Sequence, residues 1–484
     1  MKKLNFIIKC GLALLLLSFY SCESWLNVTP SDRLSEEMLF NDREGFVKAL
    51  NGVYIELNTN ELYGRNLTAG ALDVMGQYYS VASSSHAFYN YGGLVYTGND
   101  EKALFDNMWQ KCYAVIACCN TIIEKCDENK AGLSPVWKGA IKGEALALRA
   151  MLHFDMLRLF GPLTSELDKE SIPYQTNSDQ TVTPLLSGSE VVGLILDDLK
   201  NAVGLLKDTD PYFVEEEFSD TDLNYRRFRM NYFAAKGLMA RVQLWGGDKE
   251  KAAATAKEVI AEGQAEGAEF FPFVTNSEAT SSNPDRVFYS EVLFGTYHSS
   301  REKLHEDLFA PTLESTSILT LAGTARRDDL YDNENDYRYS VWSTYNKNGT
   351  SVLYHRKFEK QDNVTASRQY MIPLIRMSEM YLIAVECCKL DEASVYLNTF
   401  RNARNCNSLA LTEDNRINIL ANEYKKGMLG EGQLFFFYKR QEMVNIPDGN
   451  QATGTKNVEL AKYVVPLPES ETDQRISSTD ISNE

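Results

Sequence analysis

The chain has 484 residues, more than one small core can organise, so one large helical body and two lobes are both possible. Apolar residues make up 44% of the chain and aromatic residues 11%, which is typical of a globular protein. The formal net charge of −18 argues against a nucleic-acid partner, because phosphates need a basic protein face.

The N-terminus has the features of an export signal. Lys2 and Lys3 precede an apolar run, broken by Lys9, that is too short to be a membrane-spanning helix. We therefore predict that residues 1–21 are a signal peptide. The sequence SFYSC resembles the loose lipobox of Bacteroidetes, which implies cleavage before Cys22 and lipidation of that residue. The alternative is an ordinary signal peptide with a chance cysteine.

The segment from Glu61 to Asn99 is rich in tyrosine, glycine, serine and asparagine and has no sustained period. Tyrosine and phenylalanine rings offer large rigid faces that suit the C–H face of a sugar, and tyrosine adds a polar tip. Glycine and serine flank these rings, so we expect them at the surface; the alternative is that they pack the loops onto the helices. The candidates are Tyr78, Tyr79, His86, Phe88, Tyr89 and Tyr91, with Tyr89 and Tyr91 as first choices.

The next segment, residues 109–126, has a helical period and no helix breaker. Cys112, Cys119 and Cys126 repeat every seven residues on one face, which favours small buried side chains. Without Cys10 and Cys22 seven cysteines remain, an odd number, and the chain has no C-x-x-C pair. We therefore predict neither a disulfide framework nor a metal site.

Residues 144–162 predict a helix that ends at Gly-Pro and is apolar nearly all round, hence buried. The helix carries Arg149, His153, Asp155 and Arg158. His153 and Asp155 are two residues apart and do not share a helix face, whereas Asp155 and Arg158 can pair. A catalytic cluster is the alternative, but the chain has no G-x-S-x-G or H-E-x-x-H motif. We therefore predict a scaffold helix with paired charges and no catalytic residue.

Two segments, Asn231 to Gly263 and Arg376 to Asn405, each predict two helices joined by a tight turn. This layout looks like the tetratricopeptide repeat, a helix hairpin of about 34 residues. A single hairpin cannot bury its apolar face alone, so several should stack side by side. The apolar faces of the first pair contain Ala234, Leu238, Val242 and Trp245, then Ala252, Ala256 and Ile260.

The remaining segments are less regular. Residues 208–228 are charged and loop-like, residues 286–297 predict a strand, and residues 328–370 are polar and irregular. The acidic runs VEEEF and DNEND are predicted to be solvated loops; calcium at DNEND is the alternative, although that run lacks the glycine and terminal glutamate of a calcium loop. Further candidates for ligand contacts are Tyr297, His298, Trp342 and Tyr345.

Five blocks, in order, resemble the SusD/RagB family of outer-membrane lipoproteins of Bacteroidetes. The first is LNVTPSDRLSEEMLFNDREGFVKALNGVY, and the second, MWQKCYAVIACCNTIIE, is similar to the family's Trp-x-x-x-Tyr…Asn-Thr-Ile-Ile helix. The third is GEALALRAMLHFDMLRLFGPL, and the fourth is YMIPLIRMSEMYLIAVECC. The fifth is NEYKKGMLGEGQLFFFYKR, followed by YVVPLPESE. The family usually has Arg where Leu434 stands and Asp where Phe437 stands, which puts a local ion pair in doubt.

The resemblance implies a mainly α fold, a right-handed scaffold of tetratricopeptide-like helix pairs with small β elements and an irregular part that holds the ligand site. It implies a lipid-anchored, surface-exposed protein of the outer membrane that captures glycan for a SusC-like TonB-dependent transporter and is not an enzyme. No cofactor or metal is expected. A RagB-like peptide receptor and a secreted glycan hydrolase are the alternatives. The expected single body spans residues 22–484, with helical repeats mainly within 100–165, 190–265 and 370–440 and the irregular part mainly within 58–99 and 266–370.

Overall fold

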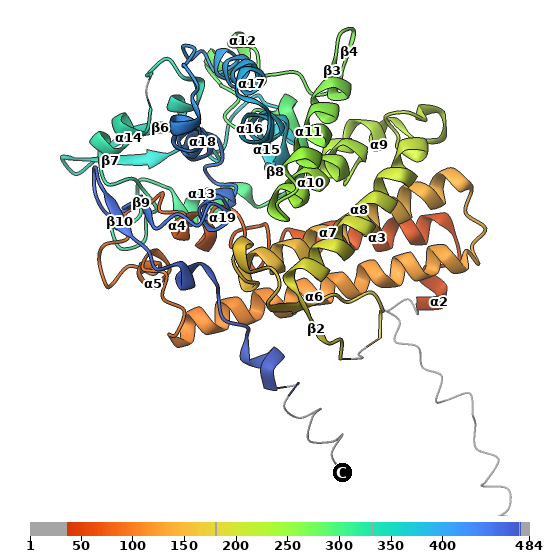
Figure 1. Cartoon of the computed structure of the whole chain (residues 1–484). Helices are drawn as coiled ribbons and strands as arrows, with labels where there is room; N and C mark the ends of the chain where they lie inside the picture. Colours follow the sequence, from red (N-terminus) through yellow and green to blue (C-terminus); the bar gives the residue numbers. More distant parts are fainter. Residues whose placement is uncertain (1–35, 180–181, 332, 474, 476–484) are drawn as a thin grey trace, which may run out of the picture.

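Stacked helices form the larger part of the molecule (Figure 1). The computed structural model describes residues 36–179, 182–331, 333–473 and 475. Its scaffold helices are α3 (Arg43–Leu57), α6 (Asn99–Glu128), α7 (Pro135–Phe160), α8 (Gly188–Thr209), α10 (Tyr232–Trp245), α11 (Lys249–Gly263), α16 (Met377–Cys387), α17 (Leu390–Asn402), α18 (Glu413–Gly427) and α19 (Gln433–Arg440).

Most of the scaffold helices pack on the next one along the chain. Helix α6 packs on α7, α7 on α8, α8 on α10, and α10 on α11; α11 then packs on α16, which contacts both α17 and α18. Helix α3 lies against α6 and α7. This order of contacts confirms the predicted mainly α fold of stacked helix hairpins. None of the helices in the described part of the chain has the length and hydropathy of a membrane span.

Helix α7 ends at the predicted Gly-Pro, but it begins at Pro135, before the predicted segment of residues 144–162. The Ser134 hydroxyl accepts a hydrogen bond from the Trp137 backbone N–H at 3.3 Å, and Pro135 occupies the first helical position. Gly161 follows the last helical residue and precedes a proline, which cannot continue a helix. From Gly143 onward every residue of α7 is buried, so this helix forms the centre of the scaffold.

The pair α10 and α11 shows how these hairpins form. The Asn231 side chain accepts a hydrogen bond from the Ala234 N–H at 2.9 Å, and Asp248 accepts one from the Lys251 N–H at 3.0 Å, so both helices have capped N-termini. Gly247, between them, has a φ of +83°, which favours glycine. The predicted apolar faces are buried: Ala234, Leu238, Val242 and Trp245 on α10, and Ala252 and Ala256 on α11, with Ile260 half-buried.

The cysteines of α6 are mostly small buried side chains. Cys112, Cys119 and Cys126 are fully buried, as the seven-residue spacing predicts, and burial raises the pKa of the Cys112 thiol. The seven cysteines of the described residues are free thiols. The predicted lipidation site, Cys22, and the predicted signal peptide, residues 1–21, lie outside the described residues.

Short helices, two-stranded antiparallel sheets, 3-10 helices and irregular loops make up the rest. The short helices are α2 (Glu36–Leu39), α4 (Ala71–Met75), α5 (Tyr89–Gly92), α9 (Asp220–Asn224), α12 (Asn276–Thr280), α13 (Arg301–Leu308), α14 (Thr324–Leu330) and α15 (Ala366–Tyr370). The strands are β1 (Glu170–Pro173) with β2 (Leu185–Ser187), β3 (Gln264–Ala265) with β4 (Ala268–Glu269), β5 (Val292–Tyr297) with β8 (Met371–Arg376), β6 (Trp342–Lys347) with β7 (Thr350–His355), and β9 (Asn445–Pro447) with β10 (Thr455–Asn457).

The pairing of β5 with β8 brings together the two ends of a long segment of the chain, residues 298–370. Tyr297 pairs with Met371, so residues 298–370 leave and rejoin the body at one place. The strand predicted over residues 286–297 is correct only for its second half. Residues 289–291 form a 3-10 turn instead, because Phe288 has a φ of +53° that breaks the extended backbone.

A hairpin lies inside the stretch that the sequence predicts to be irregular. Strands β6 and β7 pair from Trp342 opposite His355 to Lys347 opposite Thr350. The connecting residues Asn348 and Gly349 have φ values of +52° and +87°. An Asn-Gly pair suits this two-residue turn, so the expectation of irregular structure is wrong here and the signal for the hairpin was in the sequence.

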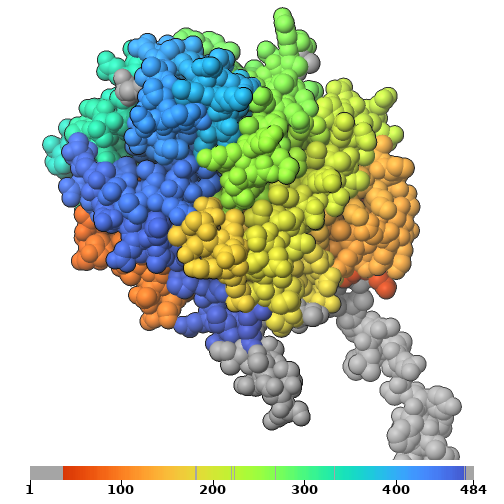
Figure 2. Space-filling view, in the orientation of Figure 1, coloured from red at the N-terminus to blue at the C-terminus, as the bar shows by residue number. Residues whose placement is uncertain are grey.

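The first and last quarters of the described chain lie side by side. Figure 2 shows the blue C-terminal surface against the orange surface of the early loops. The Tyr96 hydroxyl donates to the Lys462 carbonyl at 2.8 Å, and the Asp73 carboxylate accepts N–H groups from Gly430 at 2.5 Å and Gly432 at 3.0 Å. These contacts fix the loops before α6 onto the segment that begins α19.

Candidate functional site

The polar side chains of α7 are paired with one another and with neighbouring elements. Arg149 donates two hydrogen bonds to Asp198, at 2.7 and 2.6 Å, and Asp155 forms the predicted ion pair with Arg158. His153 Nδ1–H donates to the Arg149 carbonyl at 2.9 Å, while its Nε2 accepts a backbone N–H. Burial lowers the pKa of His153 to about 3, so the ring is neutral. The charges of α7 are therefore paired, as predicted.

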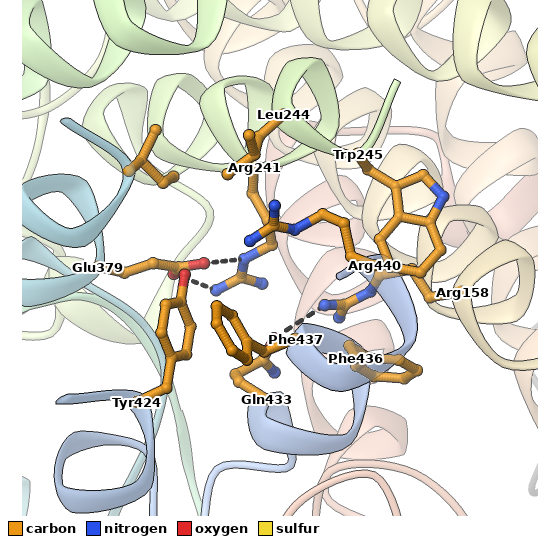
Figure 3. Close-up of a pocket in the computed structure, with 11 residues that line it drawn as sticks. Arg158, Arg241, Leu244, Trp245, Glu379, Tyr424, Gln433, Phe436, Phe437 and Arg440 are labelled. Carbon is orange, nitrogen blue, oxygen red and sulfur yellow. Dashed lines mark hydrogen bonds and ion pairs between the residues drawn. The ribbon is translucent and has the colours of Figure 1, made fainter. Parts of the chain in front are cut away.

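A small cavity lies where α7, α10, α16 and α19 meet (Figure 3). Its volume of about 30 Å³ has room for water only. Arg241 donates to Glu379 at 2.6 and 2.5 Å, Arg440 pairs with Glu386, and Arg158 pairs within α7. Each guanidinium around the cavity therefore faces a carboxylate. We call this set of ion pairs around the cavity the seam.

Leu434 and Phe437, the two residues that differ from the family pattern, are buried apolar side chains on α19. The Phe437 ring stacks on Tyr424 with centroids 4.5 Å apart, and Leu434 is buried. Apolar side chains thus stand where the resemblance implies an ion pair, and no charge is buried at these two positions.

Most rings predicted to contact a ligand are in the core. Tyr91 packs against Phe88 and Phe105, with centroids 5.8 and 6.1 Å apart, and the Tyr79 hydroxyl donates to Asp73. The expectation of surface rings is wrong here, because burying a large aromatic area against the helices is more favourable than leaving it in water. The buried candidates, each at most 5% exposed, are Tyr78, Tyr79, Phe88, Tyr91 and Trp342.

Tyr89 remains at the surface, on a set of loops that we call the loop face. The loop face consists of residues 82–90, residues 312–317 and the β6–β7 hairpin. Tyr89 is 44% exposed, and Tyr345 on the hairpin is 43% exposed. These two rings are at the surface, as expected from the sequence, and their contact with a ligand stays a prediction.

Hydrogen bonds made by residues at and beyond the ends of these loops hold the loop face together. The Ser80 N–H donates to the Thr320 carbonyl at 2.8 Å, and the Thr320 hydroxyl donates to the Leu353 carbonyl at 2.6 Å. The buried His86 ring lies with its Nε2 3.3 Å from the Ile318 carbonyl. The structure thus joins the two segments that the sequence predicts to be irregular.

Tyr297 belongs to a second group of rings, which we call the tyrosine cluster: Tyr225, Tyr297 and Tyr370. The Tyr297 ring lies 6.1 Å from Tyr225 and 5.2 Å from Tyr370, above the buried ring of Phe228 at 5.2 Å. Tyr225 is 39% exposed, and the other two are half-buried. Tyr225 follows α9, Tyr297 ends β5 and Tyr370 ends α15, so three distant segments meet here.

A groove of about 200 Å³ begins at Tyr225 and runs between α3, α7 and the segment around α9. Its aromatic walls are Tyr225, Trp137 and Phe218, and the last two rings lie 4.6 Å apart. Aromatic walls around a few polar groups are typical of small-ligand sites.

Charged groups lie at the bottom of the groove. The Glu144 carboxylate accepts hydrogen bonds from the Tyr54 hydroxyl at 2.6 Å and Arg229 Nε at 3.1 Å, and it pairs with Arg226. Burial raises the pKa of Glu144, but the two arginines outweigh it and lower the pKa, so the carboxylate is ionised. Arg229 also donates to Asn51 at the rim. Carboxylate, amide and guanidinium groups can all bind sugar hydroxyls.

Sequence reasoning missed four of these aromatic residues. Tyr225 and Phe218 lie in the charged stretch before α10. An isolated aromatic residue among charged ones is the signal there that could have identified them. Trp137 lies in the first turn of α7, and Tyr370 is the first residue of the fourth block that resembles the family. No local pattern predicts that they converge, because the β5–β8 pairing and the helix packing bring them together. His298, a further candidate, is buried.

The acidic runs differ in their surroundings. Glu215 to Glu217 are exposed, as predicted for a solvated loop. Asp336, in the other run, is buried and binds Arg338 with hydrogen bonds of 2.9 and 2.7 Å, so its oxygens are already engaged. Across the part of the chain that the structure describes, no group of three or more His, Cys, Asp or Glu side chains is placed to hold a metal ion.

Two family models match most of the chain. The model described as "Starch-binding associating with outer membrane" matches residues 24–244, and the SusD family model matches residues 283–476.

Curated relatives match over shorter stretches. A SusD-like protein P2 of Formosa agariphila is 26% identical over 265 residues, which cover 53% of this chain and 46% of that protein. A SusD-like protein of Bacteroides ovatus is 30% identical over 146 residues, which cover 29% of this chain and 23% of that protein. The alignments thus span less than half of these relatives' own length.

Solved structures have the same fold over nearly their whole length. A SusD superfamily protein from Bacteroides thetaiotaomicron has a TM-score of 0.69 and 21% identity, and the match covers 89% of this chain and 98% of that one. A laminarin-binding SusD-like protein has a TM-score of 0.64 and 17% identity over 89% of this chain and 97% of that one.

Proposed function

Because the chain belongs to the SusD family, we propose that it is a cell-surface lipoprotein that binds an oligo- or polysaccharide and delivers it to a SusC-like TonB-dependent outer-membrane transporter. The family description, starch-binding and associated with the outer membrane, supports both the ligand class and the location. In this proposal the protein is a receptor and not a hydrolase.

One observation carries the choice of site, namely the tyrosine cluster and its groove. Three half-exposed or exposed rings lie next to one another, and each adds a hydroxyl. Sugars bind by stacking their C–H faces on such rings and by hydrogen bonding to polar groups at the edge. The groove beside Tyr225 supplies those groups from Glu144, Arg229 and Asn51. We therefore propose that the glycan lies across the tyrosine cluster and reaches into the groove.

The test is a binding screen of the mature protein against purified polysaccharides and peptides, followed by variants. Covering about half of one ring face is worth about 2 kcal/mol at ~25 cal/mol per Å², or about 30-fold in affinity. Tyr225→Ala combined with Tyr297→Ala should therefore weaken binding of the best glycan by at least about tenfold. Calorimetry measures the affinity, and thermal melting checks that the variant is folded.

The loop face offers a matched control, because Tyr89 and Tyr345 are exposed aromatic rings like Tyr225. Tyr89→Ala combined with Tyr345→Ala should leave glycan affinity unchanged. Loss of binding in this control variant alone would move the site to the loop face. Binding of peptides and of no glycan would instead favour a RagB-like peptide receptor.

A second prediction concerns the membrane anchor, which lies outside the described residues. Two acyl chains anchor a protein stably where one does not, so a lipidated Cys22 would hold the chain at the membrane. Cys22→Ala should release the protein into the soluble fraction and abolish labelling by a fatty-acid probe in cells. Labelling that persists in the variant would contradict lipidation at Cys22.

A further inference from the structure

Four arginine side chains gather beside the tyrosine cluster, and we call them the arginine cluster. Arg286 donates to the Arg356 carbonyl at 3.5 Å, and Arg301 donates to the Arg368 carbonyl at 3.2 Å. The cluster adjoins the tyrosine cluster, because Arg301 begins α13 shortly after β5 and interacts electrostatically with both Arg368 and Tyr370. The members are Arg286, Arg301, Arg356 and Arg368.

Too few carboxylates face these arginines to balance their charge. Glu359 lies 2.7 Å from Arg356 and 3.5 Å from Arg286, and Asp285 lies 3.9 Å from Arg368. Four guanidinium groups thus meet two carboxylates, an excess of two positive charges in a chain whose net charge is −18. The seam in Figure 3 differs, because each arginine there has its own carboxylate.

Several guanidinium donors in the cluster also lack acceptors. The Nε atoms of Arg286, Arg301 and Arg368 are buried and have no hydrogen-bond partner. Unmade hydrogen bonds of a buried charged group are costly, so this arrangement favours an added acceptor. Burial and the neighbouring arginines, partly offset by Asp285, lower the pKa of Arg301 to about 9.

The cluster is open to solvent on one side. The side chains of Arg356 and Arg368 are 33% and 19% exposed, whereas Arg286 and Arg301 are buried beneath. An oxyanion that enters from solvent would therefore meet the two outer guanidinium groups first, and the two inner ones would add to the positive field. Planar guanidinium groups suit oxyanions, to which they can donate two parallel hydrogen bonds.

We propose that the arginine cluster binds an oxyanion, the carboxylate or sulfate group of an acidic sugar whose ring lies on the tyrosine cluster. This inference rests on the proposed glycan-binding function and specifies its substrate class as acidic glycans. Carboxylates and sulfates share the recognising chemistry, so the experiment includes both.

The test is calorimetric titration of the mature protein with three oligosaccharides and one free anion. The probes are oligogalacturonate, a sulfated galactan oligosaccharide, a neutral galactan oligosaccharide of the same length, and sodium sulfate. At least one acidic oligosaccharide should bind about tenfold or more tightly than the neutral one, and its affinity should fall as sodium chloride is added.

Two variants change the charge of the site in opposite directions. Arg356→Gln combined with Arg368→Gln should weaken acidic-glycan binding by about tenfold or more. Glu359→Gln should instead strengthen it by roughly threefold, since it removes a competing carboxylate. A gain in affinity cannot come from misfolding. The control is Arg327→Gln, which removes a surface arginine that is bonded to Asp328 on α14.

Equal binding of acidic and neutral oligosaccharides, or unchanged acidic-glycan binding in the double variant, would overturn the inference. Failure to bind sulfate or any acidic oligosaccharide would overturn it as well. Sulfate binding that is lost in the double variant, with no oligosaccharide bound, would support the oxyanion site and count against the proposed glycan-binding function.

Discussion

Replacing Glu291 by alanine is expected to lower the free energy of unfolding by about 3–5 kcal/mol, because the change leaves Arg404 as an unpaired charge in the core. Both side chains are fully buried, and Arg404 Nη1 donates to Glu291 Oε1 at 2.8 Å. The guanidinium lies 4.6 Å from the ring centre of Phe288 and 4.9 Å from that of Phe400, so its surroundings are largely apolar. Chemical denaturation at about pH 7.5 measures the loss.

Two further variants separate the effect of charge from that of side-chain volume. Glu291→Leu combined with Arg404→Met should recover part of the stability, because no charge is left unpaired. Asp307→Ala removes the partner of Lys303 in an exposed pair, and this control should change stability by less than about 0.5 kcal/mol. A loss below about 1 kcal/mol for Glu291→Ala would contradict the buried pair.

Acidification is expected to destabilise the wild-type protein through its buried histidines. The folded-state pKa of His153, about 3, lies below the value of 6.5 for an exposed histidine. The stability from neutral His153 is therefore fully present above about pH 6.5 and is lost as the pH falls toward the folded pKa. At about pH 5 this loss is about 2 kcal/mol, at about 1.4 kcal/mol per pKa unit. Burial also lowers the pKa of the other four histidines, His86, His298, His305 and His355.

Asp73 has the opposite effect on the pH dependence. Burial raises its pKa to about 7, against the backbone N–H groups of Gly430 and Gly432, so its contribution to stability grows as the pH falls. The useful measurement is therefore the difference between wild type and His153→Asn. Between about pH 7.5 and pH 5 the free energy of unfolding should fall by about 2 kcal/mol more in the wild type than in the variant. Parallel pH curves would contradict a neutral, buried His153.

The helical scaffold could be predicted because its determinants are local. Apolar residues at helical spacing in α10 and α11, the caps at Asn231 and Asp248, and the turn at Gly247 all lie within one short segment. The same holds for α7, whose ends are set by Ser134 and Gly161.

The candidate site could be predicted only in part, because its determinants are not local. Tyr78 is held in the core by the Tyr424 carbonyl, which is 346 residues away, so its burial follows from packing and not from its Gly- and Ser-rich surroundings. The sequence identifies Tyr297 as a candidate, but its neighbours Tyr225 and Tyr370 come from other segments. The arginine cluster is dispersed over residues 286–368, with no spacing that marks it.

A crystal structure of the mature protein with the best oligosaccharide from the screen tests the central claim most directly. The sugar should lie against Tyr225, Tyr297 and Tyr370, with one end toward the groove. A sugar bound on the loop face against Tyr89 and Tyr345, with the tyrosine cluster empty, would contradict the proposed site.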